Sequence, residues 1–192
     1  MSIVRWAKRN NWPFCLLIFA GSLLLPRRFR PLNRYFHQVG QAISRHGGCI
    51  DNYMGDGLLA LFGMEDPHGA ALQAVRAGLA MLEAVEGLRP YLEATYTRSF
   101  EIGIGVHYGE AVVGAIGAAD RKRMTVIGDA VNLASRIEAA NKQTGTRLLI
   151  SEDTYNEVRE EVRVGQSIRV MLPGKSGEYT LYEVIGLHHR SS

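Results

Sequence analysis

Residues 125–136 carry a short β-branched run, a Gly-Asp turn and an amphipathic helix in succession, and this strand-turn-helix pattern constrains the chain more than any other segment. Within the predicted helix, Asn132 and Arg136 are four residues apart, so they project from the same face, one turn apart. An amide both donates and accepts hydrogen bonds, and a guanidinium is a permanently charged planar group suited to phosphate oxygens. This pair fits the chemistry of phosphoryl or nucleotidyl transfer. An ordinary helix with a solvent-exposed arginine is the alternative interpretation.

The remaining patterns indicate helices and strands that intermix without a regular strand-helix-strand repeat. Helices are expected from Pro31 to the Gly47-Gly48 pair, over 70–89, from the Gly-Asp turn to about Lys142, and over 152–160 with Ser151 as the cap. Strands are expected at 49–54, 58–62, 101–107, 112–116 and 148–151, and near 168–172 and 179–185. This order predicts the α+β class with a mostly antiparallel sheet.

Charge is distributed unevenly along the 192 residues, a length typical of one domain. Residues 1–50 contain eight Lys and Arg and no acidic residue, whereas the remainder carries 14 basic and 19 acidic residues. The net charge of +3 therefore reflects the first quarter of the chain. No basic stripe interleaved with aromatic residues is present, so nucleic-acid binding is not expected. Cys15 and Cys49 have neither metal-site nor disulfide spacing, which fits a reducing cytoplasm.

An apolar segment, Phe14 to Leu25, is flanked by basic residues on both sides. It is shorter than the roughly twenty apolar residues that a membrane-spanning helix needs. A buried strand or a disordered tail is the favoured interpretation, and the alternatives are association with a membrane surface or a cleaved signal sequence. We therefore expect a cytoplasmic protein, with membrane association through this segment as the alternative.

Two further motifs accompany the strand-turn-helix segment. Residues 51–63 form a hairpin pattern, Asp-Asn-Tyr-Met-Gly-Asp-Gly-Leu-Leu-Ala-Leu-Phe-Gly, with Asp56 at its tip. Residues 102–114 form a strand-turn-strand pattern. Asp56 alone is compatible with ordinary turn chemistry. In this order, the three motifs resemble class III nucleotidyl cyclases of the bacterial adenylate cyclase type over about residues 32–185. These enzymes make cyclic AMP or cyclic GMP.

The resemblance implies a ferredoxin-like cyclase fold over 31–187, preceded by an atypical basic and apolar segment, 1–30, and followed by a tail, 188–192. In the implied reaction, the ribose 3′-hydroxyl of a nucleoside triphosphate attacks the α-phosphorus and pyrophosphate is released. Asn132 would orient the ribose, and Arg136 would stabilise the transition state. Two such sites would form in a head-to-tail dimer, either a homodimer or a heterodimer with another cyclase chain. Each site would take metal ligands from one chain and these two residues from the other.

The resemblance also implies two Mg²⁺ or Mn²⁺ ions held by two aspartates. Asp56 matches one of these aspartates, and carboxylate oxygens suit both ions. The other has no counterpart, because no acidic residue precedes Asp51 and Gly21 stands where the aspartate is expected. Either the N-terminal segment is a variant, or its reading frame is shifted or mis-started. A catalytically impaired cyclase-homology module that dimerises or binds nucleotide is therefore the alternative function.

Three positions match nucleotide contacts of the resembled family, Asn52 and Thr125 for the purine and Arg121 for the phosphates, and Lys175 is the candidate substitute for a further phosphate contact. Thr125 is typical of adenylate-specific members, and the Glu and Cys of guanylate-specific members are absent. The expected function is thus an adenylate cyclase that uses ATP in intracellular second-messenger signalling, with guanylate cyclase as the weaker alternative. The family's phosphate-binding lysine aligns with Pro173, two residues before Lys175. Solvated loop or turn positions are the competing interpretation for Arg121 and Lys175.

Overall fold

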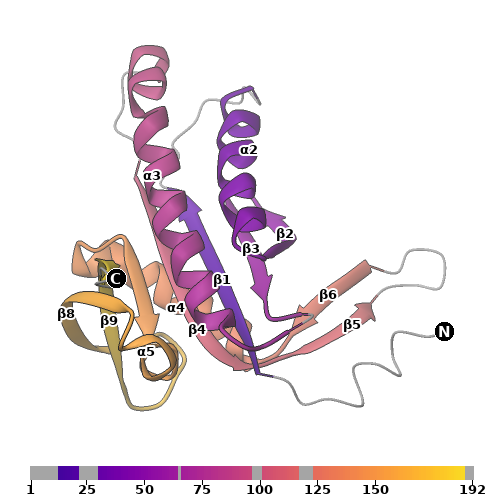
Figure 1. The fold of residues 1–192 in the computed structure, drawn as a ribbon, viewed down its shortest axis with the longest axis vertical. Coiled ribbons are helices and arrows are strands. Elements are labelled where there is room, and N and C mark those ends of the chain that lie inside the picture. The colour runs from indigo at the N-terminus through magenta and orange to yellow at the C-terminus, as the bar shows by residue number, and fades with distance from the viewer. Residues whose placement is uncertain (1–12, 22–29, 65, 97–100, 117–122, 189–192) are drawn as a thin grey trace.

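The computed structural model describes residues 13–21, 30–64, 66–96, 101–116 and 123–188. The helices are α2 (Arg30–Arg45), α3 (Ala70–Tyr96), α4 (Asp129–Thr144) and α5 (Glu152–Val158). The strands are β1 (Pro13–Gly21), β2 (Cys49–Met54), β3 (Gly57–Phe62), β4 (Ile102–Glu110), β5 (Val112–Ile116), β6 (Arg123–Ile127), β7 (Leu148–Ser151), β8 (Val162–Met171) and β9 (Glu178–Leu187). Figure 1 shows their arrangement.

One large sheet organises the fold. Within the described ranges it has seven strands in the order β2-β3-β1-β4-β7-β9-β8, while β5 and β6 form a separate two-stranded ribbon. Neighbouring strands are antiparallel except β4 and β7, which run parallel. In Figure 1 the ribbon extends away from the sheet. The predicted α+β class with a mostly antiparallel sheet is confirmed.

Strand β1 lies at the centre of the sheet, between β3 and β4. Phe19, for example, pairs with Leu58 on one side and Ile104 on the other. The apolar N-terminal segment is therefore a strand, as its favoured interpretation held, although its residues 22–25 lie outside the described part of the chain. The sheet thus includes residues on the N-terminal side of the expected boundary at 31. No helix in the described ranges is both long enough and apolar enough to cross a membrane.

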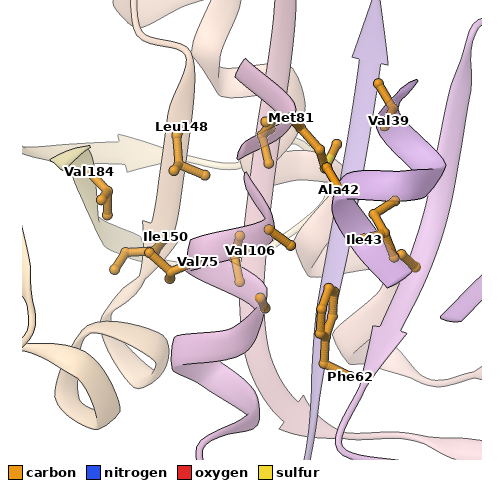
Figure 2. Packing of buried hydrophobic residues seen from close by; sticks show 14 of the residues in the cluster. Val39, Ala42, Ile43, Phe62, Val75, Met81, Val106, Leu148, Ile150 and Val184 are labelled. Atoms are coloured by element: carbon orange, nitrogen blue, oxygen red, sulfur yellow. The ribbon is translucent and has the colours of Figure 1, made fainter. Parts of the chain in front are cut away.

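Both faces of the sheet are covered. Because alternate residues of a strand point to opposite faces, Leu58 and Phe62 of β3 join the core under α2 and α3, whereas Leu59 and Leu61 pack against α4. Every residue of β3 is accordingly buried. Figure 2 shows part of the larger core, and its labelled side chains come from α2, α3 and four strands: Val39, Ala42, Ile43, Phe62, Val75, Met81, Val106, Leu148, Ile150 and Val184.

Helix α4 approaches β4 very closely at Gly105. A Cβ atom on this glycine would lie 2.3 Å from the backbone nitrogen of Glu138 and 2.5 Å from the carbonyl oxygen of Ala134. Both neighbouring atoms belong to the backbone of α4, so no side chain can move aside to make room. The glycine is therefore what allows α4, the helix that carries Asn132 and Arg136, to dock against the sheet.

Replacing Gly105 with alanine should lower the free energy of unfolding by about 3 kcal/mol, the upper end of the usual cost of overpacking. For a domain of this size the melting temperature should fall by about 6–12 °C, which calorimetry measures. Gly87 is the matched control, because it lies in α3 with no atom within 4 Å of an added Cβ. Gly87→Ala should stabilise the protein by about 0.5–1 kcal/mol. Equal melting of Gly105→Ala and the wild type would refute the close docking of α4.

Helix α3 and strand β8 extend furthest beyond their predicted ranges. Helix α3 was expected to end at residue 89, but it continues to Tyr96, although Pro90 removes one of its hydrogen bonds. The extension is tied to α2, since the Arg34 guanidinium lies 4.6 Å from the ring centroid of Tyr91. Strand β8 begins well before residue 168. Its register against β9 shifts and most of its side chains are exposed, so it lacks the alternation that marks a strand in sequence.

Candidate active site

The β2–β3 hairpin presents Asp56 at its tip. Met54 pairs with Gly57, which leaves Gly55 and Asp56 as a two-residue turn. Gly55 has a φ of 64°, in the left-handed region that such tight hairpin turns require. Tyr53, just before the turn, packs edge-on against a ring of α2, with 4.7 Å between the centroids. The predicted hairpin is confirmed. Asp56 is half-buried, and the contact of Tyr53 with α2 stabilises the strand that leads into its turn.

The end of β1 nearest the hairpin tip carries a glycine. The pairing of β1 with β3 ends at Phe19 and Leu58, and the same register continued by two residues would set Gly21 opposite Asp56. Gly21 still belongs to β1, because it pairs with Ile102 of β4. Among the described residues, no group of three or more His, Cys, Asp or Glu could hold a metal ion. Gly21 itself offers no carboxylate to pair with Asp56.

Helix α4 presents Asn132 and Arg136 away from the core. Its buried residues form the stripe that contacts the sheet: Ala130, Leu133, Ala134, Ile137, Ala140 and Asn141. Asn132 is exposed and Arg136 is half-buried, and both lie off this stripe. Both side chains can therefore reach a ligand, Arg136 with five N–H donors and Asn132 with a donor and an acceptor.

The turn between β8 and β9 folds back onto the first half of α4. Lys175 donates a hydrogen bond from Nζ to Oδ2 of Asp129, in the first turn of α4. This hydrogen bond is the main cause that holds the pKa of the Asp129 carboxyl below its ordinary value. A Cβ on Gly174 would lie 3.3 Å from Nη2 of Arg136. The structure thus places Arg136, the predicted transition-state residue, beside the β8–β9 turn that carries Lys175, a predicted phosphate contact.

Asp56 and the Arg136–Lys175 pair lie toward opposite edges of the sheet. One side of α4 packs against β3, and the other packs against β7, β9 and the residue that follows β8. The hairpin with Asp56 belongs to the β2–β3 edge, and the turn with Lys175 to the β9–β8 edge. Strands β3 and β9 are separated by four strand spacings of about 4.8 Å. A single chain therefore does not bring these two groups of residues together.

The predicted purine and phosphate contacts are distributed over several elements. Asn52 is half-buried on β2, next to an irregularity in the pairing of β2 with β3. Thr125 pairs with Gly114 in the β5–β6 ribbon, and its side chain lies outside the description. Arg121 also falls outside the described residues. The roles of these three residues remain predictions.

The sequence profile of the adenylate and guanylate cyclase catalytic domain matches residues 28–186. The chain belongs to this cyclase family. An adenylate cyclase of Anabaena cylindrica is 36% identical over 165 residues, which are 81% of this chain, and adenylate cyclase 1 of Rhizobium meliloti (strain 1021) is 32% identical over 158 residues, also 81%. The chain spans 32% and 24% of the lengths of these two proteins.

Solved cyclase structures share the fold. The guanylyl cyclase Cya2 superposes with a TM-score of 0.83 at 30% identity, over 94% of this chain and 95% of that one. The adenylyl cyclase CyaB from P. aeruginosa superposes with a TM-score of 0.81 at 26% identity, over 94% and 96%. The expected class III cyclase fold is confirmed. Because one of these two neighbours is a guanylyl cyclase and the other an adenylyl cyclase, the fold does not select the purine.

His107, Ser151 and Thr154 form a buried polar network that includes none of the predicted site residues. His107 of β4 is buried, and its Nδ1 lies 2.9 Å from Oγ of Ser151, which is in turn 3.0 Å from Oγ1 of Thr154. Ser151 caps α5 as predicted, by accepting a hydrogen bond from the Thr154 amide. Asp153 approaches the same nitrogen of His107, at 3.9 Å, so the group lacks the relay geometry of a nucleophilic triad.

Burial lowers the pKa of His107, which keeps the imidazole neutral in the folded state. A lowered histidine pKa means that the unfolded chain binds the proton more readily. This contribution to stability is therefore present above the unfolded-state pKa of about 6.5 and is lost as the pH falls through the folded-state pKa. We infer that the network stabilises the packing of α5 against β4 and β7. Sequence reasoning found its cap, but not the histidine 44 residues away.

Proposed function

We propose that this chain is the catalytic domain of an adenylate cyclase, which converts ATP to 3′,5′-cyclic AMP and pyrophosphate as an intracellular signal. The observation that carries the proposal is the placement of Asn132, Arg136 and Lys175 around the first half of α4. The adenylate cyclases from Anabaena cylindrica and Rhizobium meliloti support the choice of reaction.

In the proposed reaction, a bond forms between the ribose 3′-oxygen and the α-phosphorus, and the bond from that phosphorus to the bridging oxygen of pyrophosphate breaks. The 3′-hydroxyl loses its proton to solvent. Asn132 hydrogen-bonds the ribose and holds the hydroxyl in line with the leaving group. Arg136 donates to the oxygens of the transferring phosphate, where negative charge grows, and Lys175 offsets the charge on pyrophosphate.

Asp56 is the proposed metal-binding residue. The resemblance implies Mg²⁺ or Mn²⁺, and Mg²⁺ is often held by one or two carboxylates together with substrate phosphates. Asp56 fits a single ion carried in by the nucleotide, and the ion would supply positive charge to the phosphates. Gly21, at the end of β1, carries no carboxylate with which Asp56 could share a second ion.

The proposed active form is a dimer, either of this chain or with another cyclase chain. One chain holds Asp56 and its Arg136–Lys175 pair toward opposite edges of the sheet, so a second chain is needed to face one with the other. The hairpin that carries Asp56 also exposes Tyr53 and Met54, with 51% and 46% of their surface accessible. Exposed apolar side chains beside a polar site are typical of a protein interface.

Mixing equal amounts of Asp56→Ala and Arg136→Ala chains should restore cyclic AMP formation to about a quarter of the wild-type rate, although each variant alone should keep about a hundredth of that rate or less. Half of the randomly formed dimers are mixed, and each mixed dimer keeps one intact site of two. A mixture of Asn132→Ala and Arg136→Ala is the control, because both changes remove the same half and no intact site forms. Mixed dimers without recovered activity would contradict the two-chain site.

Nucleotide choice is tested with the purified chain, with ATP and GTP in separate assays containing Mg²⁺ or Mn²⁺. Thr125 favours adenine, whereas Asn52 can contact either purine, so cyclic AMP should be the main product. A higher rate with GTP would assign the chain to the guanylate cyclases instead.

Gly21 favours a second candidate function, a dimerising or nucleotide-binding module with little turnover. This function predicts saturable ATP binding without product, together with activity in a heterodimer whose partner supplies both aspartates. Product formation by the pure homodimer would exclude it.

A further inference from the structure

The residues that connect β8 and β9 form a tight turn that directs Lys175 toward α4. The amide of Lys175 donates to the carbonyl oxygen of Leu172 over 3.1 Å, which closes a four-residue turn. Pro173 occupies its second position, and Gly174, with a φ of 68°, its third. Proline followed by a glycine of positive φ is the signature of a type II turn. The turn explains how a lysine two residues beyond the expected position still reaches α4.

Asp129 is the group that holds this lysine. The Lys175 side chain is 13% exposed and ends on Oδ2 of Asp129, whose own side chain is 74% exposed. A free lysine loses about 2 kcal/mol of rotamer entropy when it is immobilised. Contact with Asp129 restricts Lys175 before any ligand arrives, so less of that entropy is lost on binding.

Three polar residues of α4 lie along one face of the helix. Asp129, Asn132 and Arg136 occupy positions i, i+3 and i+7 of the helix, which lie along one face. Gly174 passes beside the Arg136 guanidinium, and the next residue, Lys175, reaches Asp129. Lys175 and Arg136 are therefore held on the same side of α4.

We propose that Asp129 is a positioning residue, which acts through Lys175 by holding its ammonium beside Arg136 so that the two cations bind the polyphosphate of the nucleotide. This inference rests on the proposed cyclase function. An ammonium has three N–H donors, so one can serve Asp129 while two remain for phosphate oxygens. The Asp129 side chain is largely exposed to solvent, and its carboxylate holds Lys175 through one N–H donor, which leaves the other two for a ligand.

A purely structural role of Asp129 makes a different prediction. A carboxylate in the first turn of a helix interacts favourably with the helix dipole, whatever Lys175 does. Removing the carboxylate would then have the same effect with or without the lysine. A positioning role predicts instead that Asp129 loses its importance once Lys175 is gone, which a double-mutant cycle detects.

The experiment compares Asp129→Asn, Lys175→Met and the double variant with the wild type. As a single substitution, Asp129→Asn should lower kcat/KM for ATP about tenfold relative to the wild type. Added to Lys175→Met, it should change kcat/KM less than about twofold relative to Lys175→Met alone. Asp129→Glu should recover part of the loss. Glu152→Gln is the matched control, because Glu152 is an exposed carboxylate in the first turn of α5, and it should keep the wild-type rate. Equal losses from Asp129→Asn in both backgrounds would overturn the proposal.

Calorimetric titration with inorganic tripolyphosphate separates this inference from the cyclase assignment. If the wild type forms no cyclic nucleotide, the proposed function fails. The positioning role still predicts that Asp129→Asn alone weakens tripolyphosphate binding about tenfold. In a chain that already carries Lys175→Met, the same substitution should leave the binding unchanged. Binding of tripolyphosphate that is indifferent to Asp129→Asn would overturn the inference, whether or not the chain makes cyclic AMP.

Discussion

Replacing Arg136 with alanine should lower kcat for cyclic AMP formation by a factor of about 10²–10³, the usual cost of removing one donor that stabilises transition-state charge. The guanidinium is half-buried beside the β8–β9 turn, where a water molecule cannot reproduce its fixed charge and geometry. Because the added stabilisation is largest in the transition state, kcat should fall much more than KM rises. Steady-state kinetics with ATP measures both constants.

Two variants keep this prediction falsifiable. Ser135→Ala alters an exposed neighbour on the same helix and should keep the wild-type rate. Arg136→Lys retains the charge but not the planar set of donors, so most of the loss should remain. If Arg136→Ala kept the wild-type kcat while melting at the wild-type temperature, the assignment of the transition-state role to α4 would be wrong.

Replacing Gly21 with aspartate should raise turnover by about tenfold or more and lower the Mg²⁺ concentration needed for half-maximal rate. The register of β1 against β3, continued by two residues, would set residue 21 opposite Asp56, so the new carboxylate should complete a pair of oxygen ligands. The dependence of the rate on Mg²⁺ concentration, measured for both proteins, gives the comparison.

The gain should depend on Asp56. In a Gly21→Asp chain that also carries Asp56→Ala, turnover and Mg²⁺ affinity should both return to low values. Gly87→Asp is the control for added charge, because it places a carboxylate on an open position of α3. A folded Gly21→Asp dimer with unchanged Mg²⁺ dependence would show that residue 21 does not face the nucleotide.

Local patterns were sufficient to predict most elements of this fold. The hairpin follows from Gly55 and Asp56 between two apolar runs, and the start of α5 follows from the cap at Ser151. Patterns failed where tertiary contacts decided the outcome. Helix α3 continues past Pro90 because its end packs on α2, and β8 is an irregular strand at the sheet edge without apolar alternation.

The candidate site was predictable in its parts but not in its assembly. Asn132 and Arg136 follow from helical spacing within one segment. The contact of Lys175 with Asp129 joins residues 46 positions apart, and it depends on a turn that no pattern orients relative to α4. The resemblance predicted a glycine at position 21 in place of the first aspartate. The register that brings the end of β1 toward Asp56 could be read only from the pairing of β1 with β3.

The central position of β1 has a consequence for how the chain folds. It is the first strand of the described chain, yet its partners are β3 and β4, and Gly21 must meet Ile102 across much of the sequence. Closing so long a loop costs chain entropy before any contact forms, which slows folding. During synthesis this apolar strand leaves the ribosome before β3 and β4 have been made. Until they are, it stays unpaired, and an unpaired apolar strand can aggregate. We therefore expect the yield of folded protein to depend on temperature and on the rate of translation.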